Sequence, residues 1–324
     1  MQNICLMPWK SVNYGITKKV IIMIPKAKIL NLIAIYLYIC DIYDSKLKTV
    51  CQRFSNNSKP EFTDQEIITI YLYVMHMEQK VKIKQIHGYA NDYLRSWFPL
   101  LPSYEGFVMR INRLSEAFRY LAEILLSRHS PEDCFSDTNL LDSLPIITCS
   151  GKRKASVAKE LVDKGYCSTK NMYYFGLKLH ALAFFRPNQL PFPESIVITQ
   201  ASENDLNVYR QNWDNVNNRS LYGDKIYNDT EFSQHMWENK RTVMYTPIKA
   251  IKGQPKILSQ SDKAYNDLFS TAVSRIRQPI EALFNWLIEK TDIQRASKVR
   301  STQGLLVHVF GRIAAAYIFL IFNS

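Results

Sequence analysis

The first third of the chain carries apolar residues at helical spacing. Residues 28–128 read as a series of helices, of which 63–79 has the clearest stripe. That segment opens with Thr63 and Glu66 at capping-box spacing. Residues 82–94 and 103–126 predict further helices, separated by a turn at Pro99 and Pro102.

From Asp137 onward the pattern changes to strands. Residues 139–148 predict a strand closed by Pro145, and 171–185 a longer one in which Gly176 marks a bulge. Further strands are predicted at 194–201, 219–224 and 242–248, and helices at 203–213, 229–240 and 262–291. Three strands followed by alternating helices and strands predict a mixed sheet covered by helices. The fold class expected is α/β: a ribonuclease H-like mixed sheet with helices on both faces, preceded by an all-helical N-terminal region.

These patterns divide the chain into four segments. Residues 1–27 are expected to form an extension, 28–130 a helical region whose basic residues are candidate DNA contacts, 131–292 the ribonuclease H-like domain and 293–324 a C-terminal helical segment. Residues 1–22 are basic, contain no acidic residue and have no clear period, so Met23 is expected to be the functional start or the segment dispensable. A basic arm that wraps DNA is the alternative for this segment.

Charge and cysteine content narrow the class of partner. The 324 residues carry a formal net charge of +12, which favours nucleic acid first and an anionic membrane surface second. The six cysteines form no C-x-x-C pair, and no histidine cluster has metal-site spacing, so reduced thiols in a cytoplasmic protein are expected. Two apolar runs, 18–43 and 304–322, contain charged residues or histidine and predict packed helices, with no membrane partner.

Basic residues gather in three places. Two short helices carrying Lys82, Lys84, Arg110 and Arg113 are compatible with a helix-turn-helix-like DNA contact or with a helical bundle that has a solvated basic face. Residues 249–312 contain eleven Lys or Arg and five Asp or Glu, a net charge of +6. The candidate DNA contacts are Lys152, Arg153, Lys154, Arg277, Arg295, Lys298 and Arg300. Trp213, Trp237 and Trp286 are candidates for base stacking, although core packing is expected for most of them.

The predicted strand at 139–148 carries an acidic residue on its apolar face. Alternation places Leu140, Asp142, Leu144 and Ile146 on one face. A carboxylate on an apolar face must be paired, protonated or bound to a metal, unless it lies at a strand end and bonds backbone.

Two more acidic residues fit the same site. Asp224 follows Gly223 at the end of a predicted strand, where catalytic groups commonly collect, although Gly-Asp is also an ordinary turn. Glu281 borders the apolar stripe of the last long helix, one turn after Arg277, which is also the spacing of a surface ion pair. In a ribonuclease H-like sheet Asp142 and Asp224 lie on neighbouring strands. Three converging carboxylates repel one another unless a divalent cation lies between them, and oxygen ligands select Mg²⁺ or Mn²⁺. Two such ions suit in-line attack on a phosphodiester.

The three acidic residues lie in motifs that resemble those of a known protein family. The chain resembles the DDE transposases of bacterial insertion sequences in "DSLPI" at Asp142, "FGLKLHAL" at 175–182, "QASEND" at 200–205, "YGDKIY" at 222–227, and Arg277 with Glu281. The likeness spans roughly residues 28–322. It implies that Asp142, Asp224 and Glu281 are the catalytic, metal-binding triad, with two Mg²⁺ or Mn²⁺ ions as cofactors. The implied activity is cleavage of element ends and their joining to target DNA.

The resemblance has departures and leaves alternatives open. Many relatives have a Tyr and a Lys where this chain has Ser274 and Ile288, and Pro279 lies two residues before Glu281, where it must kink the helix or begin it with Gln278 as cap. A nuclease of the same fold without strand transfer, or a decayed DNA-binding remnant, remains an alternative. The partners expected are double-stranded DNA with terminal inverted repeats, target DNA and a second copy of the chain in the DNA complex, at the nucleoid in the cytoplasm.

Overall fold

The N-terminal region is helical, as predicted. The computed structural model describes residues 26–54, 60–128, 131–153, 155–248 and 256–322, so the predictions for residues 1–22 lie outside it. Thr63 caps the second helix through the expected capping box with Glu66. The helices of this region are α1 (Lys26–Ile42), α2 (Asp64–Glu78), α3 (Ile83–Tyr93), α4 (Tyr104–Arg113) and α5 (Ser115–Arg128), with a π-helical turn at Tyr43–Leu47.

One buried carboxylate organises these helices. Asp64, in the first turn of α2, is only 5% exposed and binds Arg53, Arg110 and Arg113. A buried charge is tolerated when it is paired and hydrogen-bonded. Arg110 and Arg113 therefore hold α4 against α2, although Arg113 is exposed. Lys82 and Lys84 are exposed.

The second half is built on a curled mixed sheet of six strands: β1 (Phe135–Ser150), β2 (Asp163–Cys167), β3 (Met172–Phe185), β4 (Phe192–Gln200), β5 (Ser220–Tyr222) and β6 (Val243–Tyr245). Strand β1 lies between β3 and β5, and β6 continues beyond β5. β2 and β4 both pair with β3, each along a different part of it. Pairs among β1–β4 are antiparallel, whereas β5 runs parallel to β1 and β6 parallel to β5.

Strand β1 continues past Pro145, where the sequence predicted an end. Pro145 lies opposite Lys178 of β3. Two residues on, Ile147 exchanges hydrogen bonds with Gln294 and Ala296 on the side away from β3, at 2.8 and 2.9 Å. The backbone nitrogen of Pro145 also faces away from β3, because residues i and i+2 of a strand share an orientation. No described strand lies on that side of Pro145, since β5 pairs only with residues 138–140 of β1. The missing N–H of Pro145 therefore removes no bond to a neighbouring strand.

The predicted bulge lies on the other strand. The register shifts between Ile147 and Cys149 of β1, opposite Gly176 and Phe175, so Thr148 is the extra residue. Gly176 permits the close approach, since a Cβ there would lie 1.9 Å from the Ile146 carbonyl oxygen. Strand β2 was not predicted.

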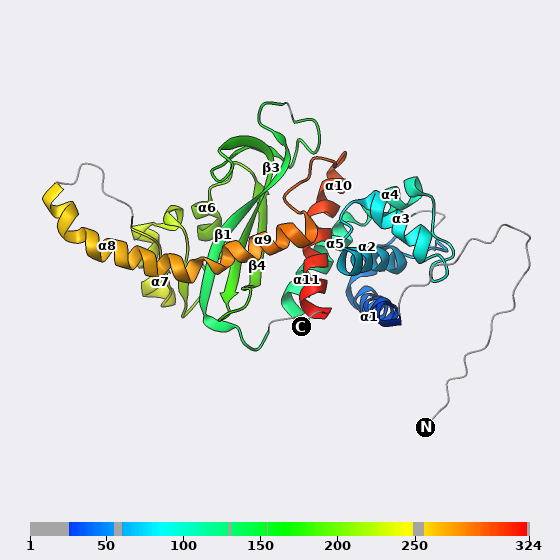
Figure 1. Cartoon of the computed structure of the whole chain (residues 1–324), viewed down its shortest axis with the longest axis horizontal. Helices are drawn as coiled ribbons and strands as arrows, with labels where there is room; N and C mark the ends of the chain where they lie inside the picture. The colour runs from blue at the N-terminus through cyan, green and yellow to red at the C-terminus, as the bar shows by residue number, and fades with distance from the viewer. Residues whose placement is uncertain (1–25, 55–59, 129–130, 154, 249–255, 323–324) are drawn as a thin grey trace, which may run out of the picture.

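Helices cover both faces of the sheet (Figure 1). On one face lie α6 (Asp205–Asn212) and α7 (Thr230–Lys240). On the other, α9 (Pro279–Thr291) packs over β1. Helix α8 (Lys256–Arg277) precedes α9 and projects away from the helical region. Pro279 occupies the first position of α9 and so begins a helix, one of the two expected arrangements. The expected cap by Gln278 is not formed, because its side chain makes no cap hydrogen bond and its backbone is helical.

The last helix joins the two halves. It consists of α10 (Thr302–Leu306), a π-helical turn (Val307–Gly311) and α11 (Arg312–Phe322). Thr302–Phe322 is long and apolar enough to cross a membrane by length and composition, but 72% of its most apolar window is buried inside the protein. Its histidine and its arginine make internal bonds: His308 Nε2 lies 2.8 Å from the Ile293 carbonyl, and Arg312 donates to the carbonyls of Thr291 and Val81. This burial agrees with the packed helix predicted from the sequence.

Acid should destabilise the fold through His308. Burial, with Arg312 nearby, lowers the pKa of His308 to about 3, against about 6.5 in an unfolded chain. The free energy of unfolding should therefore be highest above pH 6.5 and fall as the pH drops toward 3, by up to ~1.4 kcal/mol per pH unit from this residue. His308→Gln keeps a donor to the Ile293 carbonyl without titrating, so urea unfolding between pH 5 and 7 should show a shallower slope. Equal slopes in the wild type and the variant would contradict this assignment.

Candidate functional site

Asp142 lies on the face of β1 that α9 covers. It shares this face with Leu140, Leu144 and Ile146, all buried, as alternation predicted. One carboxylate oxygen accepts from the Ser143 N–H at 2.8 Å, and the other from Nη1 of Arg277 at 2.7 Å. Burial raises the pKa of Asp142 to about 6, although the Ser143 N–H and Arg277 act in the opposite direction. The carboxylate was expected to be paired, protonated or bound to a metal, and the structure shows it paired with Arg277.

Arg277 also contacts Glu281. Its Nη2 lies 2.5 Å from Oε1 of Glu281, so one guanidinium joins Asp142 to Glu281. Arg277 ends α8 and Glu281 lies in the first turn of α9, with Pro279 between them. The Glu281 side chain is half exposed, whereas that of Asp142 is 23% exposed. The surface ion pair that the spacing allowed is thus formed, and it extends to the partly buried Asp142.

Asp224 comes to the same level as Asp142. β1 and β5 are parallel, and Leu140 lies opposite Tyr222. Each aspartate follows its paired residue by two positions, which places both at equal height on neighbouring chain segments. Asp224 is exposed, caps a short 3-10 helix (Lys225–Tyr227), and accepts from the Lys225 N–H at 2.7 Å. Gly223 is required here, since a Cβ would lie 2.7 Å from the Tyr227 ring.

A cleft of about 760 Å³ opens beside these residues. Asp224 and Lys225 line one side, and α8 and α9 contribute Arg275, Arg277 and Glu281. Asp142 is not among the residues that line it, and its partner Arg277 is. The cleft therefore presents the carboxylates of Asp224, Asp267 and Glu281 at its surface, and that of Asp142 lies behind the Arg277 guanidinium.

The donor atoms suit a hard cation, but the side chains do not form a closed ligand set. All three carboxylates are oxygen donors, as Mg²⁺ and Mn²⁺ prefer. Within the described residues, no group of three or more His, Cys, Asp or Glu side chains is arranged to hold one metal ion. The Arg277 guanidinium lies where it neutralises Asp142 and Glu281. Convergence of the three carboxylates on an ion stays a prediction.

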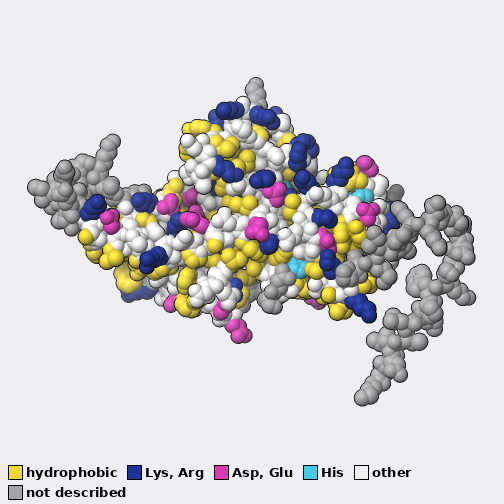
Figure 2. All heavy atoms as spheres, in the orientation of Figure 1, with side chains coloured by type: hydrophobic (Ala, Val, Ile, Leu, Met, Phe, Trp, Pro, Cys, Tyr) yellow, Lys and Arg dark blue, Asp and Glu magenta, His cyan; other side chains and the backbone are white. Residues whose placement is uncertain are grey.

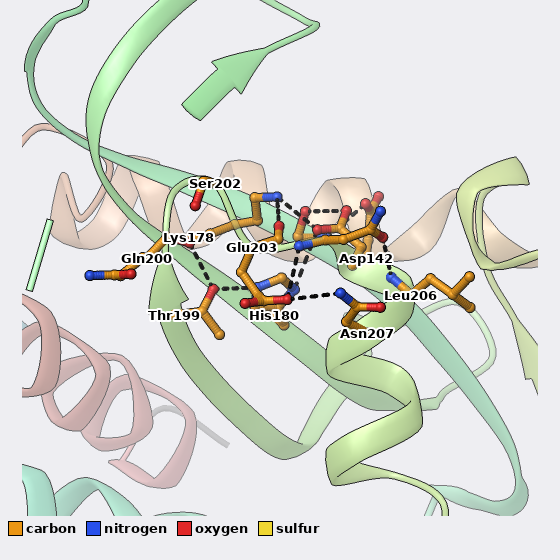
Figure 3. Close-up of polar contacts among 12 residues, drawn as sticks. Asp142, Lys178, His180, Thr199, Gln200, Ser202, Glu203, Leu206 and Asn207 are labelled. Atoms are coloured by element: carbon orange, nitrogen blue, oxygen red, sulfur yellow. Dashed lines mark hydrogen bonds and ion pairs between the residues drawn. The ribbon is translucent and has the colours of Figure 1, made fainter. Parts of the chain in front are cut away.

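A second polar layer lies on the opposite face of β1. Asp205, at the start of α6, accepts from Ser143 Oγ at 2.9 Å and from Lys178 Nζ at 2.9 Å, and it lies 3.6 Å from His180 Nδ1. Lys178 also donates to the Glu203 carbonyl and His180 Nε2 lies 2.8 Å from Thr199 Oγ1 (Figure 3). Ser143 thus bonds Asp142 through its N–H and Asp205 through its hydroxyl.

Sequence reasoning used these residues only as signs of a resemblance and assigned them no role. A signal was present: Lys178 and His180 are two residues apart within an apolar strand, so they share one face. Burial, with Lys178 close by, outweighs the opposite effect of Asp205 and lowers the pKa of His180 to about 4.

The predicted phosphate contacts gather at the far end of β1. Lys152 and Arg153 are exposed just after β1, and Arg295, Lys298 and Arg300 are exposed after α9. The hydrogen bonds of Ile147 to Gln294 and Ala296 bring these two stretches together. Lys154 lies outside the described residues. Of the tryptophans, Trp213 is buried and Trp286 packs on Phe319, while Trp237 is half exposed beside Arg241.

Comparison of the chain with protein-family models, curated proteins and solved structures finds no match.

The Asp142–Arg277 pair should couple strongly. Removing one partner of a buried ion pair leaves an uncompensated charge, which costs up to 3–5 kcal/mol when burial is complete. Because both side chains here are partly exposed, Arg277→Gln should lower the free energy of unfolding by about 1–3 kcal/mol, and Asp142→Asn should recover part of that loss. Urea unfolding of the two single variants and the double variant measures the coupling. Arg119→Gln, which breaks exposed pairs on α5, is the control and should cost less than about 1 kcal/mol. Additive effects of the two substitutions would contradict the coupling.

Proposed function

We propose that this protein is a DDE transposase with a ribonuclease H-like core, and that Asp142, Asp224 and Glu281 are its catalytic carboxylates. The observation that carries the proposal is the parallel register of β1 and β5, which brings Asp142 and Asp224 to one level, together with the Arg277 bridge from Asp142 to Glu281. The antiparallel pairing among β1–β4 and the parallel pairs of β1, β5 and β6 support the fold assignment.

The chemistry proposed is two-metal phosphoryl transfer. When bound, Mg²⁺ or Mn²⁺ would activate the attacking hydroxyl and stabilise the leaving oxygen. The carboxylates of Asp142, Asp224 and Glu281 would hold the ions. Arg277, which pairs with Asp142 and Glu281 here, would turn to a DNA phosphate, for which its planar guanidinium is well suited. Lys225 and Arg275 line the same cleft and would attract the DNA backbone.

The two alternatives differ from the proposal in what the site does. A nuclease of this fold would cut DNA without joining it. A decayed remnant would bind DNA and do neither. Pro279, and Ile288 where many relatives have Lys, are the two departures that favour the remnant. Pro279 occupies the first position of α9, where proline is favoured. The helix break therefore gives no support to the remnant. A homodimer on DNA and a nucleoid location accompany the proposal as predictions.

Removing either aspartate should abolish cleavage but not binding. Purified protein is given Mg²⁺ or Mn²⁺ and DNA that carries the flanking repeats, and cleaved and joined products are separated on gels. Asp142→Asn and Asp224→Asn should show no cleavage, with DNA affinity equal or higher because negative charge is lost. Asp41→Asn, at an exposed position of α1, is the matched control. Unchanged cleavage in either site variant would refute the assignment, and a pre-cut end that is never joined would favour the nuclease.

The basic residues after α9 should make DNA binding depend on salt. If Arg295, Lys298 and Arg300 contact phosphates, changing all three to alanine should flatten the slope of log K against log salt by about two to three units. Fluorescence anisotropy of labelled duplex at several salt concentrations measures the slope. An unaltered slope would show that these side chains are only solvated.

A further inference from the structure

Strands β2 and β3 carry a pair of exposed tyrosines that no predicted function uses. Tyr166 and Tyr173 lie directly opposite each other across the two strands, with ring centroids 5.1 Å apart and planes inclined by 59°. They are 50% and 60% exposed, respectively. On the other face of the same strands, Cys167, Tyr174 and Ala201 form a small buried cluster. One face of this hairpin is therefore packed and the other presents aromatic rings to solvent.

Cations surround the pair. Lys164 Nζ lies 5.0 Å from the centre of the Tyr173 ring. The Gly151 N–H donates to the Tyr173 carbonyl at 2.8 Å, which brings Lys152 and Arg153 beside the hairpin. Lys170, in the turn between the strands, donates to Gln294 and so joins the hairpin to the basic stretch after α9. Figure 2 shows Lys and Arg side chains gathered on this lobe.

These cations are available to a ligand. Lys152, Arg153, Lys164 and Lys170 form no ion pair with any described acidic side chain, whereas the neighbouring Arg295 lies 3.7 Å from Asp292. We call Tyr166, Tyr173, Lys152, Arg153, Lys164 and Lys170 the tyrosine–lysine face. It combines stacking surface with unpaired positive charge.

Unpaired nucleotides match this chemistry. Bases stack on aromatic rings while phosphates contact Lys and Arg, and such stacking requires bases that are not already stacked inside a duplex. An anionic membrane also attracts aromatic and basic residues, but membrane-binding faces add Trp, Phe or Leu. Tyrosines are the large exposed apolar side chains of β2 and of the adjoining part of β3. Nucleic acid with a single-stranded segment is the better fit.

We propose that the tyrosine–lysine face binds an unpaired segment of DNA by stacking bases on Tyr166 and Tyr173. The face is distinct from the cleft: Asp142 and Ser150 are eight residues apart on β1, which is about 25 Å of extended chain. The choice of DNA as ligand rests on the proposed function. Binding itself needs neither the carboxylates nor a metal, so it is tested separately from catalysis.

The test compares two DNAs that differ only in pairing. Full-length protein carrying Asp142→Asn, which cannot cleave under the proposal, is titrated with a duplex and with the same duplex containing a short single-stranded gap. A 2-aminopurine in the gap reports stacking by loss of fluorescence. Changing Tyr166 and Tyr173 together to alanine should weaken gapped-DNA binding by about 30-fold or more, change duplex binding less than twofold and abolish the quenching. Changing both tyrosines to phenylalanine should preserve the affinity for gapped DNA, the affinity for duplex and the quenching.

Matched controls separate stacking from stability and charge. Tyr120→Ala removes another exposed tyrosine, which lies beside Arg119 on α5, and should leave both affinities unchanged. If the alanine variant does not fold, the proposal is tested with the protein that keeps both tyrosines and with the phenylalanine variant. Both proteins must bind gapped DNA more tightly than duplex and must quench the probe. Equal losses on the two DNAs, no loss, or no preference for the gap would overturn the proposal. A tyrosine-dependent binding to anionic phosphatidylserine vesicles without gap preference would overturn it in favour of a membrane.

Discussion

The carboxylate of Asp142, set among apolar side chains on the central strand, is the constraint from which the site is built. A charge in this position needs a partner, and Arg277 supplies it across the interface between sheet and helix. That ion pair fixes the end of α8 against β1. Pro279 then begins α9 at the next residue but one, and the first turn of α9 brings Glu281 to the same guanidinium. One electrostatic requirement thus positions both helices relative to the sheet.

The two faces of β1 carry different polar residues of the site. Asp142 lies on the face covered by α9, and Ser143 on the face covered by α6. Ser143 connects the faces, because its N–H binds Asp142 and its hydroxyl binds Asp205. Lys178 holds Asp205 and the loop before α6. The conformation of the candidate catalytic strand therefore depends on residues that never reach the cleft.

Features that depend on neighbouring residues could be predicted from the sequence. Contacts between residues far apart in the sequence could not. The capping box at Thr63, the helical N-terminal region and the strand around Asp142 follow from a few neighbouring residues, whereas the sequence left open whether Pro279 kinks a helix or begins one. Strand β2 was missed because five residues with a glycine and two charges show no alternation. The partner of Arg110 and Arg113 is Asp64, nearly fifty residues away, and the Arg277–Asp142 pair spans 135 residues. Spacing reveals pairs on one helix but not pairs between elements.

The shared hydrophobic core has a consequence for how the protein is made. Helix α11 packs against α2 and α5, and Arg312 binds the Val81 carbonyl that follows α2. α11 is synthesised more than 200 residues after α2, a delay of roughly 10 to 50 s at ordinary rates of translation. For that interval the N-terminal helices cannot complete their core, and their apolar faces stay open to chaperones or to aggregation. Expression yield should therefore depend on temperature and chaperone supply more than the size of the finished core suggests.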